Sequence, residues 1–193
     1  MTLKSLKTLL PFIMAAFTPV LTSHALAEVI ESSKITPYKI TGGTVEEVRE
    51  QITLKGPKDG DTPRISHINA KVGWRFRTQM VGSKCVITEV KVMISIVRTV
   101  PELISNNKEL KSQFARFRKR IDAHHEGHAN NARSMARQMD RGIAALPRAT
   151  TCDELKRSVE RLGNRLGEET AAANREYAAR TEYGRALGAT WPP

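Results

Sequence analysis

The sequence predicts an α+β domain in which an antiparallel sheet, preceded by a short N-terminal helix, is covered by a long antiparallel hairpin of two helices. Residues 68–76 and 86–96 alternate apolar and polar positions, as strands with one buried face do. Residues 110–145, and those from about 151 to 177, instead repeat apolar residues every three or four positions, which is typical of helices. A sheet with one apolar face needs a cover, and the helices supply it.

Residues 1–27 have the pattern of a secretory signal peptide. Lys4 and Lys7 precede an apolar run from Leu9 to Val20, and Ala25-Leu26-Ala27 matches a small-residue cleavage site. The run is short for a bilayer span, which favours a cleaved leader over an uncleaved anchor. We therefore expect an exported protein, periplasmic or extracellular, whose residues 28–193 form a single domain.

The residues after the leader predict little regular structure before the sheet. Glu28–Lys34 should be loose, and Tyr38–Thr41 should be a short strand. Thr44–Glu47 has the spacing of a capping box, because the threonine hydroxyl can accept from the amide three residues on while the glutamate reaches back. It predicts a helix from Val45 to about Leu54, followed by an exposed loop over Gly56–Pro63.

Two long strands form the predicted sheet, and Val81–Lys84 should join them as a hairpin turn. On the first strand the apolar set is Ile68, Ala70, Val72, Trp74 and Phe76, and the other set is Asn69, Lys71, Gly73, Arg75 and Arg77. The second strand alternates in the same way. One face of the sheet should therefore be apolar and the other basic.

The two covering helices should lie side by side. Pro147 stops the first helix, and the second begins near Thr151, with Thr151 or Asp153 as the N-cap. A connection this short makes the helices antiparallel neighbours. The chain should then leave the second helix at a glycine of the tail Thr181–Gly188.

Cys85 and Cys152 are the only cysteines, and both follow the leader. In an oxidising compartment, two cysteines most simply form one disulfide, here closing a loop of roughly 67 residues and stabilising the fold by about 4 kcal/mol. The alternative is two free buried thiols. No CxxC spacing supports a metal site built on these cysteines.

The chain is strongly basic. Its formal net charge of +11 falls to about +9 without Lys4 and Lys7. No run of aromatics among the basic residues could stack bases, so we expect no nucleic-acid partner. In an exported protein such a charge favours an anionic envelope surface, or serves only solubility.

Three histidines within five residues stand out on the first covering helix. His124 and His128 are one turn apart, about 40° from each other around the helix, which is the spacing of two ligands to one zinc ion. His125 follows the first ligand, where H-E-x-x-H enzymes place the glutamate that holds the metal-bound water. Glu126 lies about 180° from the midline of the pair and should face solvent. The alternative is that these histidines are only interior polar residues of a packed helix.

A catalytic zinc needs a third protein ligand. His24 would leave with the signal peptide, and His67 lies on the strand face opposite the apolar set. The tail that follows the second helix carries Glu182 and Tyr183, and either could complete the site.

On these residues the chain resembles the bacterial exported proteins grouped as domain of unknown function family 922, described as predicted secreted zinc-dependent proteases. The matching segments cover nearly all of the mature chain: Tyr38–Gly42 with Thr44, Trp74–Phe76, Cys85, His124–His128, Cys152, and Tyr177, Thr181–Gly184 and Gly188 in a Y-x-x-x-T-x-H-G pattern. The resemblance implies a zincin-like fold with His124 and His128 as zinc ligands. Two positions depart from the pattern, because His125 replaces the glutamate base and Tyr183 replaces a histidine.

Two functions follow from these residues. The first is an exported zinc-dependent hydrolase acting on peptide or protein substrates, with His124, His128 and Tyr183 around the zinc and His125 as the base, since a neutral imidazole can accept a proton near pH 7. The second is a catalytically inactive periplasmic structural or binding protein on the same scaffold.

Overall fold

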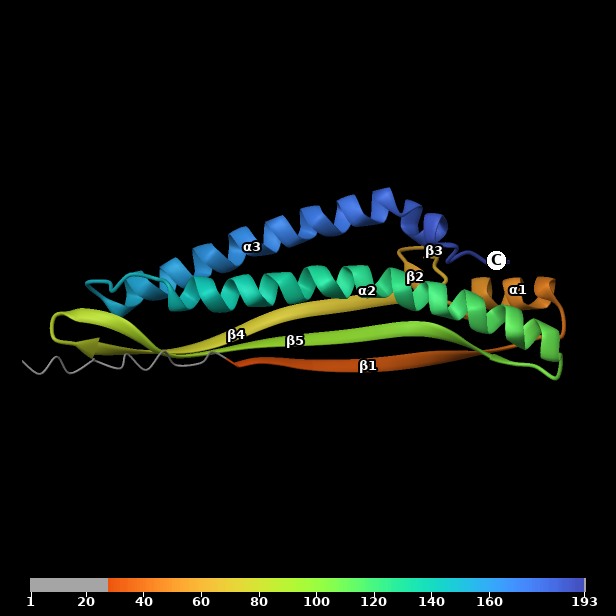
Figure 1. The fold of residues 1–193 in the computed structure, drawn as a ribbon, viewed down its shortest axis with the longest axis horizontal. Helices are drawn as coiled ribbons and strands as arrows, with labels where there is room; N and C mark the ends of the chain where they lie inside the picture. Colours follow the sequence, from red (N-terminus) through yellow and green to blue (C-terminus); the bar gives the residue numbers. More distant parts are fainter. Residues whose placement is uncertain (1–27, 193) are drawn as a thin grey trace, which may run out of the picture.

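A three-stranded sheet runs along the two longest helices of this computed structural model, which describes residues 28–192 (Figure 1). The strand order is β1-β5-β4, with β1 at Glu28–Thr41, β4 at His67–Val81 and β5 at Lys84–Ile104. β4 and β5 form the predicted antiparallel hairpin, and Gly82 turns it with a positive φ of 61°. The mixed α+β class is therefore confirmed.

β1 differs from the prediction. The segment Glu28–Lys34, expected to be loose, is half of a 14-residue edge strand that pairs in parallel with β5. Its side chains are mostly polar on both faces, so no alternation marks it as a strand. The long central strand β5 supplies the backbone partners along its whole length, which only the assembled sheet can offer.

The helix α2, Lys108–Ala144, covers the apolar face of the sheet, and α3, Cys152–Arg180, packs beside it as an antiparallel neighbour (Figure 1). The main core joins β5 to α2 and α3 through small and aliphatic side chains: Val92, Ile94, Ile96, Ala129, Ala132, Ala136, Met139, Ile143, Val159 and Leu166. α3 also touches the sheet, because a Cβ at Gly163 would collide with the Trp74 ring of β4. The predicted helical hairpin is confirmed.

The second core lies at the other end of α2. The helix α1, Val45–Lys55, begins at the predicted Thr44 capping box. It packs Val48 and Ile52 with Phe114 and Phe117 of α2, and Trp191 near the C-terminus donates its Nε1–H to the Val45 carbonyl at 3.1 Å. The C-terminal segment is thereby fixed against α1 and α2, close to the histidine segment of α2.

The remaining connections are short. The loop at Gly56–Pro63 contains a two-residue strand pair, β2 at Lys58–Asp59 and β3 at Thr62–Pro63. Of the two N-cap candidates for α3, Thr151 caps the helix, in a capping box with Glu154. Cys85 and Cys152 form the predicted disulfide, which ties the start of α3 to β5. Within residues 28–192, no helix combines the length and apolar character that a membrane span requires.

Candidate metal centre

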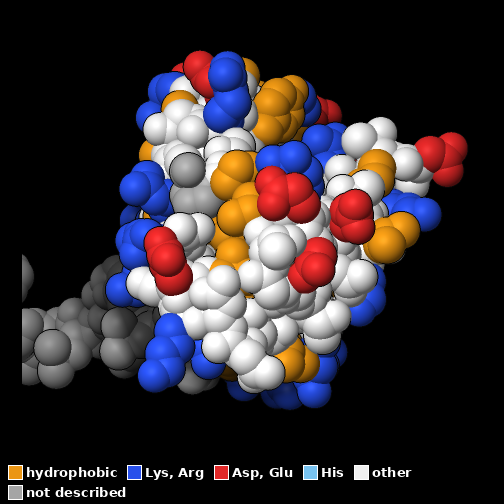
Figure 2. All heavy atoms as spheres, turned by 90° about the vertical axis from the view of Figure 1, so that its right-hand side faces the viewer, with side chains coloured by type: hydrophobic (Ala, Val, Ile, Leu, Met, Phe, Trp, Pro, Cys, Tyr) orange, Lys and Arg blue, Asp and Glu red, His pale blue; other side chains and the backbone are white. Residues whose placement is uncertain are grey.

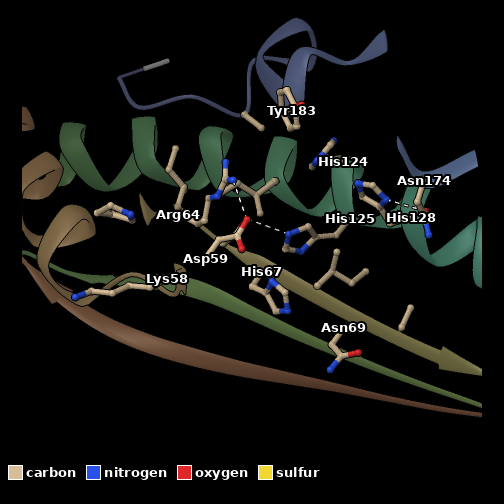
Figure 3. A pocket seen from close by; sticks show the side chains of 17 residues that line it. Lys58, Asp59, Arg64, His67, Asn69, His124, His125, His128, Asn174 and Tyr183 are labelled. Atoms are coloured by element: carbon tan, nitrogen blue, oxygen red, sulfur yellow. Dashed lines mark hydrogen bonds and ion pairs between the residues drawn. The ribbon is translucent and has the colours of Figure 1, made fainter. Parts of the chain in front are cut away.

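Two of the three histidines of α2 share one face of the helix, and the third, His125, points another way (Figure 3). His124 and His128 lie together, with ring centroids 5.0 Å apart and ring planes nearly perpendicular. His125 turns toward the segment that precedes β4. All three line one cavity of about 810 Å³ between α2, the start of β4, the β2–β3 hairpin and the tail.

Oxygens of α3 and its C-cap hold the Nδ1 atoms of the pair. His128 Nδ1 lies 2.9 Å from Asn174 Oδ1, and His124 Nδ1 lies 3.4 Å from Thr181 Oγ1. The Asn174 oxygen also accepts from Asn131 Nδ2, and the Thr181 hydroxyl donates its proton to the Tyr177 carbonyl. Both oxygens therefore act as acceptors toward the histidines, which places the proton on each Nδ1 and the lone pair on each Nε2.

This tautomer is the one in which histidine binds a metal through Nε2. Metal-bound histidines usually donate their other N–H to an oxygen, which fixes the ring and raises its basicity. Within residues 28–192, neither Nε2 atom of the pair has a hydrogen-bond partner. Burial lowers the pKa of His124 to about 4, and the neighbouring His128 adds to the effect, so this ring is neutral at pH 7.

Tyr177 of α3 fixes the two rings from the side. Its ring stacks on His124 at 5.4 Å with an interplanar angle of 16°, and it meets His128 edge-on at 4.9 Å. The approach requires the glycine at position 127, because a Cβ there would overlap the phenol ring. The glycine of the His124–His128 motif is thus explained by packing.

His125 forms its hydrogen bond on another side of α2 from the His124–His128 pair. Its Nε2 lies 3.0 Å from Ser66 Oγ, and the residue is 2% exposed. Burial, the neighbouring His124 and the positive charges of Arg118 and Arg98 lower the pKa of His125 to about 3. Its Nδ1 is buried and has no partner within the described residues. The imidazole lines the shared cavity but is anchored to the strand side of it.

Glu126 is exposed and lies away from the histidine pair, as predicted. Its carboxylate also accepts from Arg98 at 2.8 Å and from Arg133, which in turn pairs with Glu31 of β1. Glu126 therefore links α2 to the central strand β5, and Arg133 extends this link to β1 through Glu31.

The candidate third ligands, Tyr183, Glu182 and His67, differ in whether they line the cavity of the histidine pair. Tyr183 lines the cavity near His124 and is 74% exposed, and the next residue, Gly184, lies against the His124 ring (Figure 3). Glu182 pairs with Arg185 at 2.5 Å and does not line the cavity, whereas His67 lines it from β4. No three His, Cys, Asp or Glu side chains of residues 28–192 are grouped so as to hold a metal ion. The arrangement fits a metal held by two histidines, with a tyrosine nearby.

The structure adds residues that the sequence did not single out. Asn174 and Ser66 come from α3 and from the segment before β4, and each contacts a histidine of α2. No spacing in the sequence links them to His128 and His125, because they are 46 and 59 residues away along the chain.

Fold and site together define an α+β protein that carries an H-x-x-x-H pair on its covering helix. The family model described as "Bacterial protein of unknown function (DUF922)" matches residues 35–184. The chain belongs to this family. Searches among curated proteins and among solved structures return no match.

Proposed function

We propose that this protein binds zinc, or a similar divalent transition metal, through Nε2 of His124 and Nε2 of His128. The observation that carries the proposal is the pair of Nδ1–H donors held by Asn174 and Thr181, which leaves both lone pairs free on the cavity side. Hydrogen bonds at Nδ1 would also suit a packed helix, so the proposal rests on the two Nε2 atoms that lie beside one cavity without partners among the described residues. Zinc–histidine bonds in proteins are about 2.1 Å long, so two rings whose centroids lie 5.0 Å apart could share one ion.

Tyr183 is the proposed third protein contact. It stands near His124 at the cavity mouth, and a phenolate oxygen can bind a metal ion. Because only two of the proposed ligands are histidines, we expect the site to bind zinc more weakly than a catalytic site with three protein ligands. A metal ion held at this site would supply Lewis acidity to whatever oxygen or nitrogen ligand completes its coordination.

We propose further that the site does not hydrolyse peptide bonds. Hydrolysis by this class of site needs a base beside the metal-bound water, and position 125 carries an imidazole anchored to Ser66. Asp59, the carboxylate on the cavity wall, is engaged by Arg64 at 2.9 Å. The protein is then a binding member of a family that resembles secreted zinc-dependent proteases.

Export is part of the same proposal. The signal-peptide pattern of residues 1–27 supports it, and a disulfide between the two cysteines is typical of proteins from oxidising compartments. The location we propose is the periplasm or the extracellular space.

Metal binding is tested by calorimetric titration of zinc into metal-free, untagged protein and by melting curves with and without zinc. Zinc should bind with a stoichiometry of one and raise the melting temperature, since a ligand of the folded state stabilises it. His124→Ala with His128→Ala should abolish both effects, while Glu126→Gln, on the other side of α2, should retain them. Identical melting curves with zinc and with chelator would refute the metal site.

Catalysis is tested separately, on an unstructured protein substrate with zinc and with chelator. We expect no zinc-dependent cleavage by the wild type or by His125→Ala. The paired change His125→Glu with Tyr183→His restores both residues of the family pattern and is the variant in which cleavage should emerge. Chelator-sensitive cleavage by the wild type that His125→Ala removes would show that His125 is a working base and would overturn the non-hydrolytic part of the proposal.

A further inference from the structure

The face of the sheet opposite α2 carries a concentrated positive charge. The pairing registers place Arg75 beside Lys91, Lys71 beside Ser95, and Lys34 beside Val97, all pointing away from the core residues Val92, Ile94 and Ile96. Among the side chains that the structure describes, five cations lie on this open face: Lys34, Lys71, Arg75, Arg77 and Lys91. Its one described acid, Glu89, is paired with Arg77 and Lys91.

The two long helices differ in their share of the charge. α3 carries six basic and six acidic residues, so its charges cancel. α2 carries nine basic and four acidic residues and is positive as well. The end of the molecule that carries α1 gathers acidic side chains, while Lys and Arg lie around its outline (Figure 2). The net positive charge is therefore unevenly distributed, and most of it lies on α2 and on the open face of the sheet.

The fold gains only the exposed ion pairs of Glu89 from this arrangement, and such pairs stabilise a protein little. Arg75 and Lys91 are directly opposite each other on neighbouring strands, where like charges destabilise a sheet. Lys34, Lys71, Arg75, Arg77 and Lys91 are all exposed. A surface that keeps cations together at a cost to its own stability points to an anionic partner.

We propose that this open face, defined by Lys34, Lys71, Arg75, Arg77 and Lys91 with the apolar residues between them, docks on a bilayer surface that carries anionic lipid headgroups. Three strands give a broad face suited to a bilayer plane, and basic side chains near such a surface each add to the attraction. Ile30, 44% exposed, lies with Met93 between the cations and can enter the headgroup region. The aromatic residues of β4, Trp74 and Phe76, point to the core instead, so the face has no platform for stacking nucleic-acid bases.

The docking would leave the metal centre free. The histidine pair lies on α2, on the opposite side of the sheet, and its cavity opens between α2, the β2–β3 hairpin and the tail. This inference does not depend on zinc binding, and either proposal can fail without the other.

The test is sedimentation of the full-length protein with vesicles of phosphatidylglycerol and phosphatidylcholine, compared with vesicles of phosphatidylcholine alone. Binding should require the anionic lipid and should weaken as salt rises, because exposed charges are screened. The triple variant Lys71→Gln, Arg75→Gln, Lys91→Gln should bind about 100-fold more weakly, from about fivefold per basic residue. Lys71→Gln alone should lower binding about fivefold, which keeps the test valid if the triple variant folds poorly.

The matched control is Lys156→Gln, Arg157→Gln, Arg161→Gln on the exposed side of α3, which removes the same charge from the helical side of the molecule. It should lower binding no more than about threefold, the effect of reduced net charge at long range. All variants keep residues 1–27, so any contribution of that segment cancels. Equal losses in the two triple variants, equal binding to neutral vesicles, or tighter binding to duplex DNA than to anionic vesicles would each overturn the proposal.

Discussion

The contact between Gly127 and Tyr177 predicts that Gly127→Ala destabilises the protein, although replacing a helical glycine by alanine usually stabilises it. Alanine in place of a glycine inside a helix normally stabilises it by about 1 kcal/mol, because glycine loses more backbone freedom on folding. At position 127 the added methyl would overlap the Tyr177 ring, which is itself wedged against His124 and His128. Displacing that ring should cost about 3 kcal/mol, at the upper end of overpacking penalties, so Gly127→Ala should destabilise the protein by about 2 kcal/mol.

Gly167 provides the matched control. It lies inside α3, and a Cβ there meets nothing within 4 Å, so Gly167→Ala should stabilise the protein by about 1 kcal/mol. In a Tyr177→Ala background the obstacle at position 127 is gone, and Gly127→Ala should then also stabilise by about 1 kcal/mol. The two sites are therefore expected to show a coupling of about 3 kcal/mol.

The assay is urea unfolding followed by circular dichroism for the wild type, the single variants and the double variant. Zinc titration of the same proteins adds a functional readout, since Gly127→Ala should weaken zinc binding through the displaced rings whereas Gly167→Ala should leave it intact. The reasoning is refuted if Gly127→Ala stabilises the wild-type protein as much as Gly167→Ala does, because Tyr177 would then not occupy the space beside Gly127.

Three further predictions concern the disulfide, the pH dependence of stability, and the hydrogen bond between Asn174 and His128. Replacing both cysteines by serine should lower the free energy of unfolding by about 4 kcal/mol in urea titrations, as expected for a closed loop of 67 residues, and a loss below 1 kcal/mol would contradict this. Stability should fall as the pH drops from about 6.5 toward 3 and should be flat from pH 7 to 8: the native state keeps His124 and His125 neutral, with pKa values of about 4 and 3, while the unfolded chain takes up protons near 6.5. His125→Gln should remove much of that acid sensitivity, and unchanged sensitivity would show that other groups cause it. Asn174→Leu should weaken zinc binding about 10- to 100-fold by releasing His128 Nδ1, whereas Arg175→Leu, the matched change at the next position, should have little effect in the same calorimetric titration.

The sequence by itself determined the elements whose side chains follow a strong local rule. Alternation in residues 68–76 and 86–96 predicted β4 and β5, because one face of each strand is buried under α2. The three- and four-residue repeats predicted α2 and α3, and the capping box at Thr44 marked the start of α1. For α3 the sequence offered Thr151 or Asp153 as the N-cap, and the structure decided for Thr151. The one-turn spacing of His124 and His128 placed them on one face of α2, since helix geometry alone fixes that angle.

Tertiary structure alone decided whatever depends on partners far along the chain. β1 is a strand because β5 offers it a backbone edge, and its own polar residues carry no signal of that pairing. Glu126 is bound because Arg98 and Arg133 meet it from β5 and from the next turns of α2. The proton positions on the histidine pair follow from Asn174 and Thr181, which the α2–α3 packing brings to the two rings from 46 and 57 residues away. A local pattern can place a side chain on one face of a helix, but the groups that hold its ring come from wherever the fold brings them.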